Sequence, residues 1–152
     1  MSNPTAGATL GTPVSATLTI TTPQLFLALE EAALDPNQVA AFDAMLMLRD
    51  PFPVVNPLNL LFGQQTDRNT RVVVFVTNLQ LAPNDVASVV KVNLVAGNGQ
   101  IFDLEAQDVR MTPVSNLSQV TFRLPDNLAP GVCAIKIKAH NQESNQGNIR
   151  IQ

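Results

Sequence analysis

The chain has 152 residues, of which 45% are apolar and 14% charged, with a formal net charge of −3 and a single cysteine. This length suits one domain, or a domain of about 100 residues with an accessory segment, and the composition excludes a disordered chain. The chain lacks a membrane-spanning apolar run, a basic stripe, and any Trp or Tyr that could stack on bases. We therefore expect a globular protein that binds no nucleic acid and does not span a membrane.

Residues 1–22 form a lead-in rich in Gly, Pro and Thr that ends in one predicted strand, "SATLTIT". Its apolar residues Ala16, Leu18 and Ile20 alternate with serine and threonine, as in a strand with one buried face. Because a single strand is not stable alone, it must pair with a sheet of this chain or of a neighbouring molecule. We expect these three residues to form a strand-pairing interface.

Residues 23–50 change to a helical period. Thr22 followed by Pro23 predicts the start of one helix, and Asp35 followed by Pro36, with Gln38 as capping-box partner, predicts a second. We expect a helical hairpin over residues 23–34 and 36–48 that covers one face of a sheet. Its apolar faces are predicted to contain Leu25, Leu29 and Ala32 in the first helix and Val39, Phe42 and Leu46 in the second.

A proline-broken connector over residues 51–70, with a short edge strand expected at 58–62, precedes a series of strands with period two. "TRVVVFVTNL" has apolar residues on both faces and predicts a central strand, with the helical hairpin as its second cover. "SVVKVNLVAGNGQIFDLEA" predicts a hairpin that turns at Gly97-Asn98-Gly99. "LSQVTFRL", "GVCAIKIKAH" and "NIRIQ" add three strands, and together these predict an antiparallel β-sandwich over residues 51–152. Alternation predicts that Lys136 and Lys138 face outward and that the core-facing residues of these three strands are Val120, Phe122, Leu124, Cys133, Ile135, Ile137, Ile149 and Ile151.

The last of these strands carry a family resemblance. "LPDNLAPGVCAIKIKAHNQESNQGNIRIQ" resembles the ending of bacterial immunoglobulin-like modules of the IPT/TIG type, and "TRVVVFVTNLQL" is similar to their early strand. The resemblance covers about residues 54–152. It implies an immunoglobulin-like fold, and because its motifs are turn motifs it says more about fold than about function.

A second resemblance is local. "AGATLGTPVSATLTIT" is similar to the last strand of a Calx-beta domain, which in that family runs into a calcium-binding Asp-Asn-Asp cluster. Here Thr22, Pro23 and Gln24 follow instead, so calcium is not expected. The two resemblances together imply the C-terminal end of a bacterial multidomain surface protein, with residues 1–22 as a Calx-beta-like remnant.

Candidate chemistry is sparse. Cys133 and His140, seven residues apart on one predicted strand, are expected to point to opposite faces, with Cys133 in the core and His140 in a turn. Asp103, Glu105 and Asp108 form the densest carboxylate cluster, which a glycosidase or a calcium site could use. A solvated sheet face opposed by Arg123 or Arg110 is the favoured interpretation. We predict no catalytic residue, no cofactor and no metal site.

The expected function is that of a non-catalytic, immunoglobulin-like structural or protein-interaction module of a secreted or cell-surface bacterial protein, although no signal peptide is visible in the sequence. Its partners would be other domains or proteins at the cell surface, or copies of itself. One alternative is a self-assembling surface or filament subunit that uses the N-terminal strand for β-augmentation. The other is a carbohydrate-binding module, which the presence of seven Phe without Trp or Tyr weakens.

Overall fold

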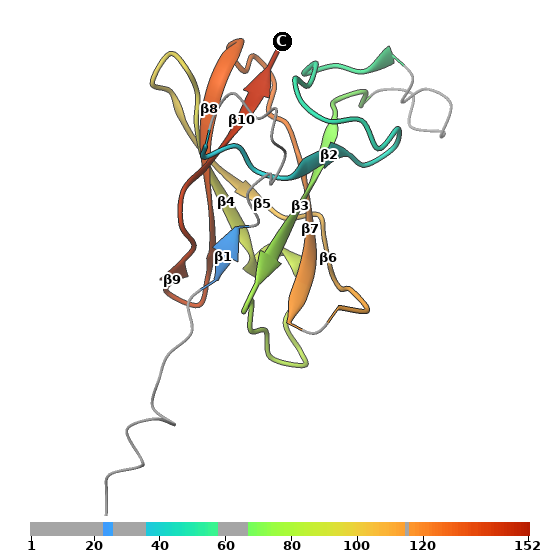
Figure 1. Cartoon of the computed structure of the whole chain (residues 1–152), viewed down its shortest axis with the longest axis vertical. Coiled ribbons are helices and arrows are strands. Elements are labelled where there is room, and N and C mark those ends of the chain that lie inside the picture. The colour runs from blue at the N-terminus through green and yellow to red at the C-terminus, as the bar shows by residue number, and fades with distance from the viewer. Residues whose placement is uncertain (1–22, 26–35, 58–66, 115) are drawn as a thin grey trace, which may run out of the picture.

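The computed structural model describes residues 23–25, 36–57, 67–114 and 116–152, which form two antiparallel sheets (Figure 1). A short 3-10 helix, η2 (Ala87–Val89), precedes β4. The first sheet contains β1 (Gln24–Leu25), β2 (Ala41–Asp43), β3 (Arg71–Thr77), β6 (Asp108–Met111) and β7 (Leu117–Arg123). The second sheet contains β4 (Lys91–Val95), β5 (Ile101–Glu105), β8 (Gly131–Ala139), β9 (Gln142–Glu143) and β10 (Gly147–Ile151).

The strand order is β1-β3-β7-β6 in the first sheet and β10-β8-β4-β5 in the second. β1 and β2 follow one another along the edge of β3 opposite β7, because Gln24 lies opposite Thr77 and Ala41 lies opposite Val74. β9 pairs with the end of β8. The predicted central position of β3 is therefore confirmed, since both of its edges are paired.

One hydrophobic core joins the two sheets. The predicted inward residues of every strand after residue 70 alternate as expected and are fully or almost fully buried, with the exception of Phe102 and Leu104, which are half-buried at the edge. Alternate apolar side chains meet between the sheets because successive side chains of a strand point to opposite faces. The buried set includes Val72, Val74, Val76, Val92, Leu94, Val120, Phe122, Cys133, Ile135, Ile137, Ile149 and Ile151.

The stretch "LPDNLAPG" turns the chain from β7 into β8. Leu124 and Leu128 are buried on the core side, while Asn127 and Gly131 have positive φ angles of 60° and 121°. A φ of 121° is strained for any residue with a Cβ atom, which explains why glycine begins β8. The predicted hairpin between β4 and β5 is likewise confirmed, with Gly99 at a φ of 88° in its turn.

The predicted helix over residues 36–48 is wrong. Gln38 forms a parallel bridge with Asn148, residues 41–43 form β2, and residues 44–46 form a turn. Of the first predicted helix, Gln24 and Leu25 form β1, while residues 26–34 lie outside the described residues. In the part of the chain that the structure describes, no helix is long and apolar enough to cross a membrane.

Two interactions explain why this segment is extended. The open edge of β3 offers backbone hydrogen bonds to β2, and tertiary context of this kind overrides helix propensity. The carboxylate of Asp43, which is 5% exposed, accepts hydrogen bonds from the backbone N–H groups of Met45 and Leu46 at 2.8 and 2.9 Å and from the Asn56 side chain at 3.2 Å. Aspartate bonds of this type favour a turn over a helix.

The outer face of β3 is covered differently from the prediction. Val73 is only 4% exposed on this face, and Phe42 of β2 packs edge to face on Phe75, with ring centroids 6.1 Å apart. The guanidinium of Arg49 lies 5.6 Å from the Phe42 ring centroid. Phe42, placed in the second helix by its spacing, thus packs as part of a strand.

Two further predictions fall outside the described residues. They are the strand-pairing residues Ala16, Leu18 and Ile20 and the short edge strand at 58–62.

Replacing Ile135 by alanine tests the inward face of β8. Ile135 is fully buried, so the truncation should lower the free energy of unfolding by about 2–5 kcal/mol, whereas Lys136→Ala, on the outer face of the same strand, should change it by about 0.5 kcal/mol or less. Urea denaturation of both variants measures the difference. Equal losses would contradict the assigned register.

Candidate functional site

The outer face of the second sheet carries a row of charged residues that crosses four strands. Glu105 of β5 lies opposite Lys91 of β4, Lys91 lies opposite Lys138 of β8, and Lys138 lies opposite Glu143 of β9. Cross-strand neighbours of this kind interact directly, and like charges placed opposite one another are unfavourable. The two acidic residues at the ends of the row offset the repulsion between the two lysines.

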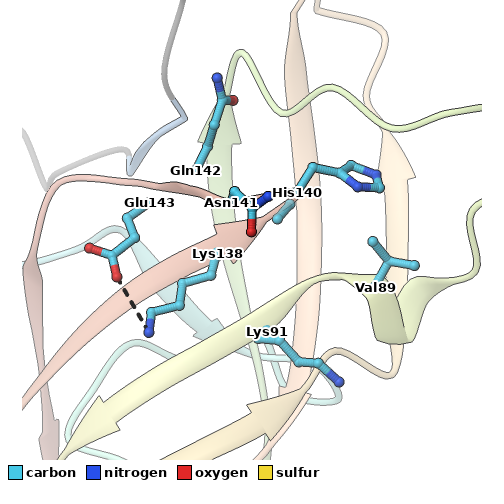
Figure 2. A pocket seen from close by; sticks show the side chains of 8 residues that line it. Val89, Lys91, Lys138, His140, Asn141, Gln142 and Glu143 are labelled. Atoms are coloured by element: carbon cyan, nitrogen blue, oxygen red, sulfur yellow. Dashed lines mark ion pairs between the residues drawn. The ribbon is translucent and has the colours of Figure 1, made fainter.

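The ion pairs have clear geometry. Lys91 Nζ lies 2.8 Å from Glu105 Oε1, and Lys138 Nζ lies 3.3 Å from Glu143 Oε2. Figure 2 shows the ammonium groups of the two lysines pointing apart, that of Lys138 toward Glu143. Lys136, two residues before Lys138 on the same face, lies 3.7 Å from the other oxygen of Glu143. Because these side chains remain about one third exposed or more, the pairs contribute little to stability and leave a charged, accessible face.

A hollow of about 630 Å³ lies over this row. Val89, Lys91, Lys138 and residues 139–143 line it (Figure 2). Ammonium, carboxylate, amide and imidazole groups therefore surround one open surface depression. Such a set suits polar contacts with another molecule more than the burial of an apolar ligand.

The β8–β9 turn beside the hollow is held by one polar contact. His140 and Asn141 have positive φ angles of 47° and 66°, and His140 Nε2 lies 2.6 Å from Asp85 Oδ2. The hydrogen bond from His140, together with one from the Ala82 backbone N–H, holds the pKa of Asp85 below its ordinary value. The contact fixes the turn against the loop before η2.

The chain has three lysines, Lys91, Lys136 and Lys138, and all of them lie on this one face. Further along the same face two apolar side chains, Ile101 and Val132, are 67% and 47% exposed, beside the charged residues Asp103 and Arg150. The outer face of the second sheet thus combines charged side chains with two exposed apolar ones. Sequence alternation predicted that Lys136 and Lys138 face outward, but not that Lys91 would join them across the sheet.

The residues considered for chemistry in the sequence are separated. Cys133 is fully buried in the core, where desolvation raises the pKa of its thiol, and His140 lies in a turn at the surface. Both expectations are confirmed, and the two side chains do not form a catalytic pair.

The carboxylate cluster is also divided. Asp103 and Glu105 share the outer face of the second sheet, whereas Asp108 belongs to the first sheet and pairs with Arg110 at 2.7 Å. The prediction that Arg110 opposes the cluster is confirmed for Asp108. The alternative partner, Arg123, contacts Asp67 and Asp126 instead. Among the described residues no three His, Cys, Asp or Glu side chains come together as a metal site.

A second ionic network, which the sequence did not reveal, lies at the start of β3. Asp67 accepts hydrogen bonds from the Arg71 guanidinium at 2.9 and 3.1 Å and from Arg123 Nε at 2.9 and 3.0 Å. Arg123 and the side chain of Asn69 both bond to Asp126. The spacing of Asp67 and Arg71 was a local signal, but Arg123 is 56 residues away in sequence. The network ties the connector before β3 to the end of β7.

The whole chain gives no match to models of known protein families, to curated proteins or to solved structures.

Replacing Asp67 by asparagine tests the second network through its pH dependence. The hydrogen bonds from Arg71 lower the pKa of Asp67 from 3.8 to about 2, so the ionised carboxylate stabilises the fold fully above about pH 4, and this contribution is lost as the pH falls toward 2. We expect Asp67→Asn to lower the free energy of unfolding by about 1 kcal/mol at pH 7, since the group is partly exposed.

The gap between the wild type and Asp67→Asn should narrow at pH 3, as measured by urea denaturation at both pH values. Asp103→Asn is the matched control, because Asp103 is exposed opposite Asn93 rather than a cation. A gap of equal size at pH 3 and pH 7 would show that the ionised form of Asp67 is not what stabilises the network.

Proposed function

We propose that the chain is an immunoglobulin-like β-sandwich module that catalyses no reaction and serves as a structural and protein-interaction unit of a secreted or cell-surface bacterial protein. The strand order is the observation that carries this proposal. With β1 and β2 counted as one interrupted first strand, the first sheet has the order A-B-E-D of immunoglobulin-like sandwiches, and the second has the order G-F-C followed by one extra strand.

The stretch that resembles IPT/TIG modules supports the same proposal. Its "LPDNLAPG" turn buries Leu124 and Leu128 and leads into β8, and its end forms β10, which pairs with β8. These are the positions of the last two strands of such a module. Because a fold does not by itself determine a function, the proposed role is also supported by the residues on the outer face of the second sheet.

The outer face of the second sheet is the proposed contact face. It gathers every lysine of the chain, two acidic partners, a hollow of about 630 Å³ and the exposed apolar residues Ile101 and Val132. A mixture of exposed apolar area with complementary charges is what a protein partner requires, because the apolar part supplies affinity and the charges supply orientation. The proposed partner is therefore another protein, which for a surface module would be a neighbour at the cell surface.

Lysine labelling tests the location and the contact face together. A membrane-impermeant amine reagent is applied to intact cells and to the purified protein, with the exposed substitution Arg68→Lys as a reference away from the second sheet. We expect the introduced lysine to react equally in both samples, and Lys91, Lys136 and Lys138 to react severalfold less on cells, as read by mass spectrometry. Labelling of the introduced lysine only after lysis would contradict a surface location, and equal labelling of the native lysines would contradict the contact face.

Metal addition tests whether the module depends on an ion. A ligand that binds only the folded state raises the melting temperature, so we expect calcium or zinc in excess to leave the thermal unfolding of the full chain unchanged. Differential scanning calorimetry with and without each ion makes the comparison, with magnesium as the control. A rise of several degrees with one ion would contradict the proposed metal-independent role.

A further inference from the structure

One edge of the second sheet is open. β5 ends the strand order, and no strand of the described residues pairs with its outer side. Two backbone hydrogen bonds, from Ala96 N–H to the Gln100 carbonyl and from Ala106 N–H to the Val90 carbonyl, mark hydrogen-bonded positions between β4 and β5. Because hydrogen-bonded pairs occur at every second position, Phe102 and Leu104 bond to β4. The backbone N–H and C=O groups of Ile101, Asp103 and Glu105 therefore point away from the sheet.

The core is also incomplete at this edge. Phe102 and Leu104 point to the inner side of β5 and pack against the core, but both are only half-buried. Ile101, Asp103 and Glu105 occupy the outer side and are exposed. A strand added beside β5 could extend both sides of the sheet if apolar residues alternated along it with small polar ones. Its apolar residues would lie beside Phe102 and Leu104, and its polar residues would lie on the outer face.

We propose that residues 14–21 of a second copy of this chain add to β5 as an extra strand, with Ala16, Leu18 and Ile20 covering Phe102 and Leu104. This inference rests on the proposed role as an interaction module and names its partner. Residues 1–22 contain no charged side chain, so their serine and threonine residues can lie beside Asp103 and Glu105 without repulsion. The new backbone hydrogen bonds satisfy the outward groups of β5, as in other cases of strand addition.

The short spacing between the donor segment and β1 favours a donor from another copy. β1 lies at the edge of the first sheet opposite β6, and β6 follows β5 after only Ala106 and Gln107. Crossing from β1 to β6 spans three strand spacings, about 14 Å, before the second sheet is reached. Residue 21 is three residues from Gln24 and can reach only about 10–11 Å from it. A strand in which the end of this segment, including Ile20, lies beside β5 therefore comes from another copy.

β6 also ends its strand order among the described residues, but it is a poorer acceptor. It has four residues, and Val109 is its one side chain that packs against the core. β5 has five residues and offers two half-buried apolar side chains to an incoming strand. Because the donor segment and the acceptor edge are different surfaces, the contact is heterologous, and repetition of it extends an open chain of subunits rather than a closed dimer.

Two matched substitutions in the donor segment test the proposal without altering the described fold. Light scattering of the full wild-type chain should give a weight-average mass that rises with concentration to at least twice 16.3 kDa. Ile20→Asp should abolish the rise, because it places a charge on the covered row, whereas Thr19→Lys, which places a charge on the opposite row beside Asp103 and Glu105, should leave most of it. A monomeric wild type at all concentrations, or equal effects of the two substitutions, would overturn the proposal.

A complementary substitution tests the acceptor. Asp103→Pro removes an outward N–H, which an edge strand tolerates in its own sheet but an added strand needs. Asp103→Pro and Ile20→Asp should each be monomeric alone, and an equimolar mixture should form a heterodimer that grows no further, because one intact donor and one intact acceptor remain. A mixture that stays monomeric would overturn the assignment of β5.

A cysteine pair locates the contact. Thr19→Cys combined with Asp103→Cys should give intermolecular disulfides on oxidation. As the control, Thr19→Cys combined with Arg110→Cys, on β6, should give none. The reverse result would move the acceptor to β6 and overturn the proposal. Failure of the inference is distinguishable from failure of the proposed function. A chain that is monomeric yet labelled on intact cells loses the self-assembly and keeps the module, whereas a chain labelled only after lysis loses the surface role.

Discussion

The pairing of β3 on both edges is the constraint on which the rest of the structure depends. Val72, Val74 and Val76 fill the core from one face, and their backbone groups bond to β7, while Val73 bonds to β2. The Asp67 network fixes the start of β3 and the Asp43 turn fixes β2 beside it. With β3 buried in this way, the first sheet presents one apolar face, and the second sheet must pack against it.

Strand period was enough to predict most of this core. Alternation along "LSQVTFRL" and "GVCAIKIKAH" placed Phe122, Cys133 and Ile135 inward, and a one-residue slip would have exposed all of them. Glycine and asparagine at positive φ marked the turns. These features are local, because a strand and its turn are determined by neighbouring residues, and that is why the sequence predicted them well.

The sequence-based predictions that were wrong or incomplete concern interactions between residues distant in sequence. The segment 36–48 has helical spacing, but its backbone hydrogen bonds go to β3 and to β10, which local pattern cannot indicate. β6 is short and polar enough to be missed. The candidate surface was only partly predictable for the same reason: alternation placed Lys136 and Lys138 outward, whereas the register that brings Lys91 beside Lys138 depends on strand order.

The two proposals use neighbouring parts of one sheet. β4 and β8 carry the lysines of the contact face, and β5 provides both Glu105, which pairs with Lys91, and the free edge for a second copy. A strand added to β5 would widen the outer face that the lysines share. Contact with other proteins and self-assembly can therefore coexist, since one uses side chains on the face and the other uses backbone groups at the edge.

Amide hydrogen exchange along β3 of the full chain tests the central claim most directly. Val72 and Val74 donate toward β7 and Val73 donates toward β2, so the account predicts that all three amides exchange only through global unfolding, at the same free energy. If Val73 exchanges far faster than its two neighbours, β2 does not pair with β3. That result would contradict the two-edged β3 and restore a helical or detached segment at residues 36–48.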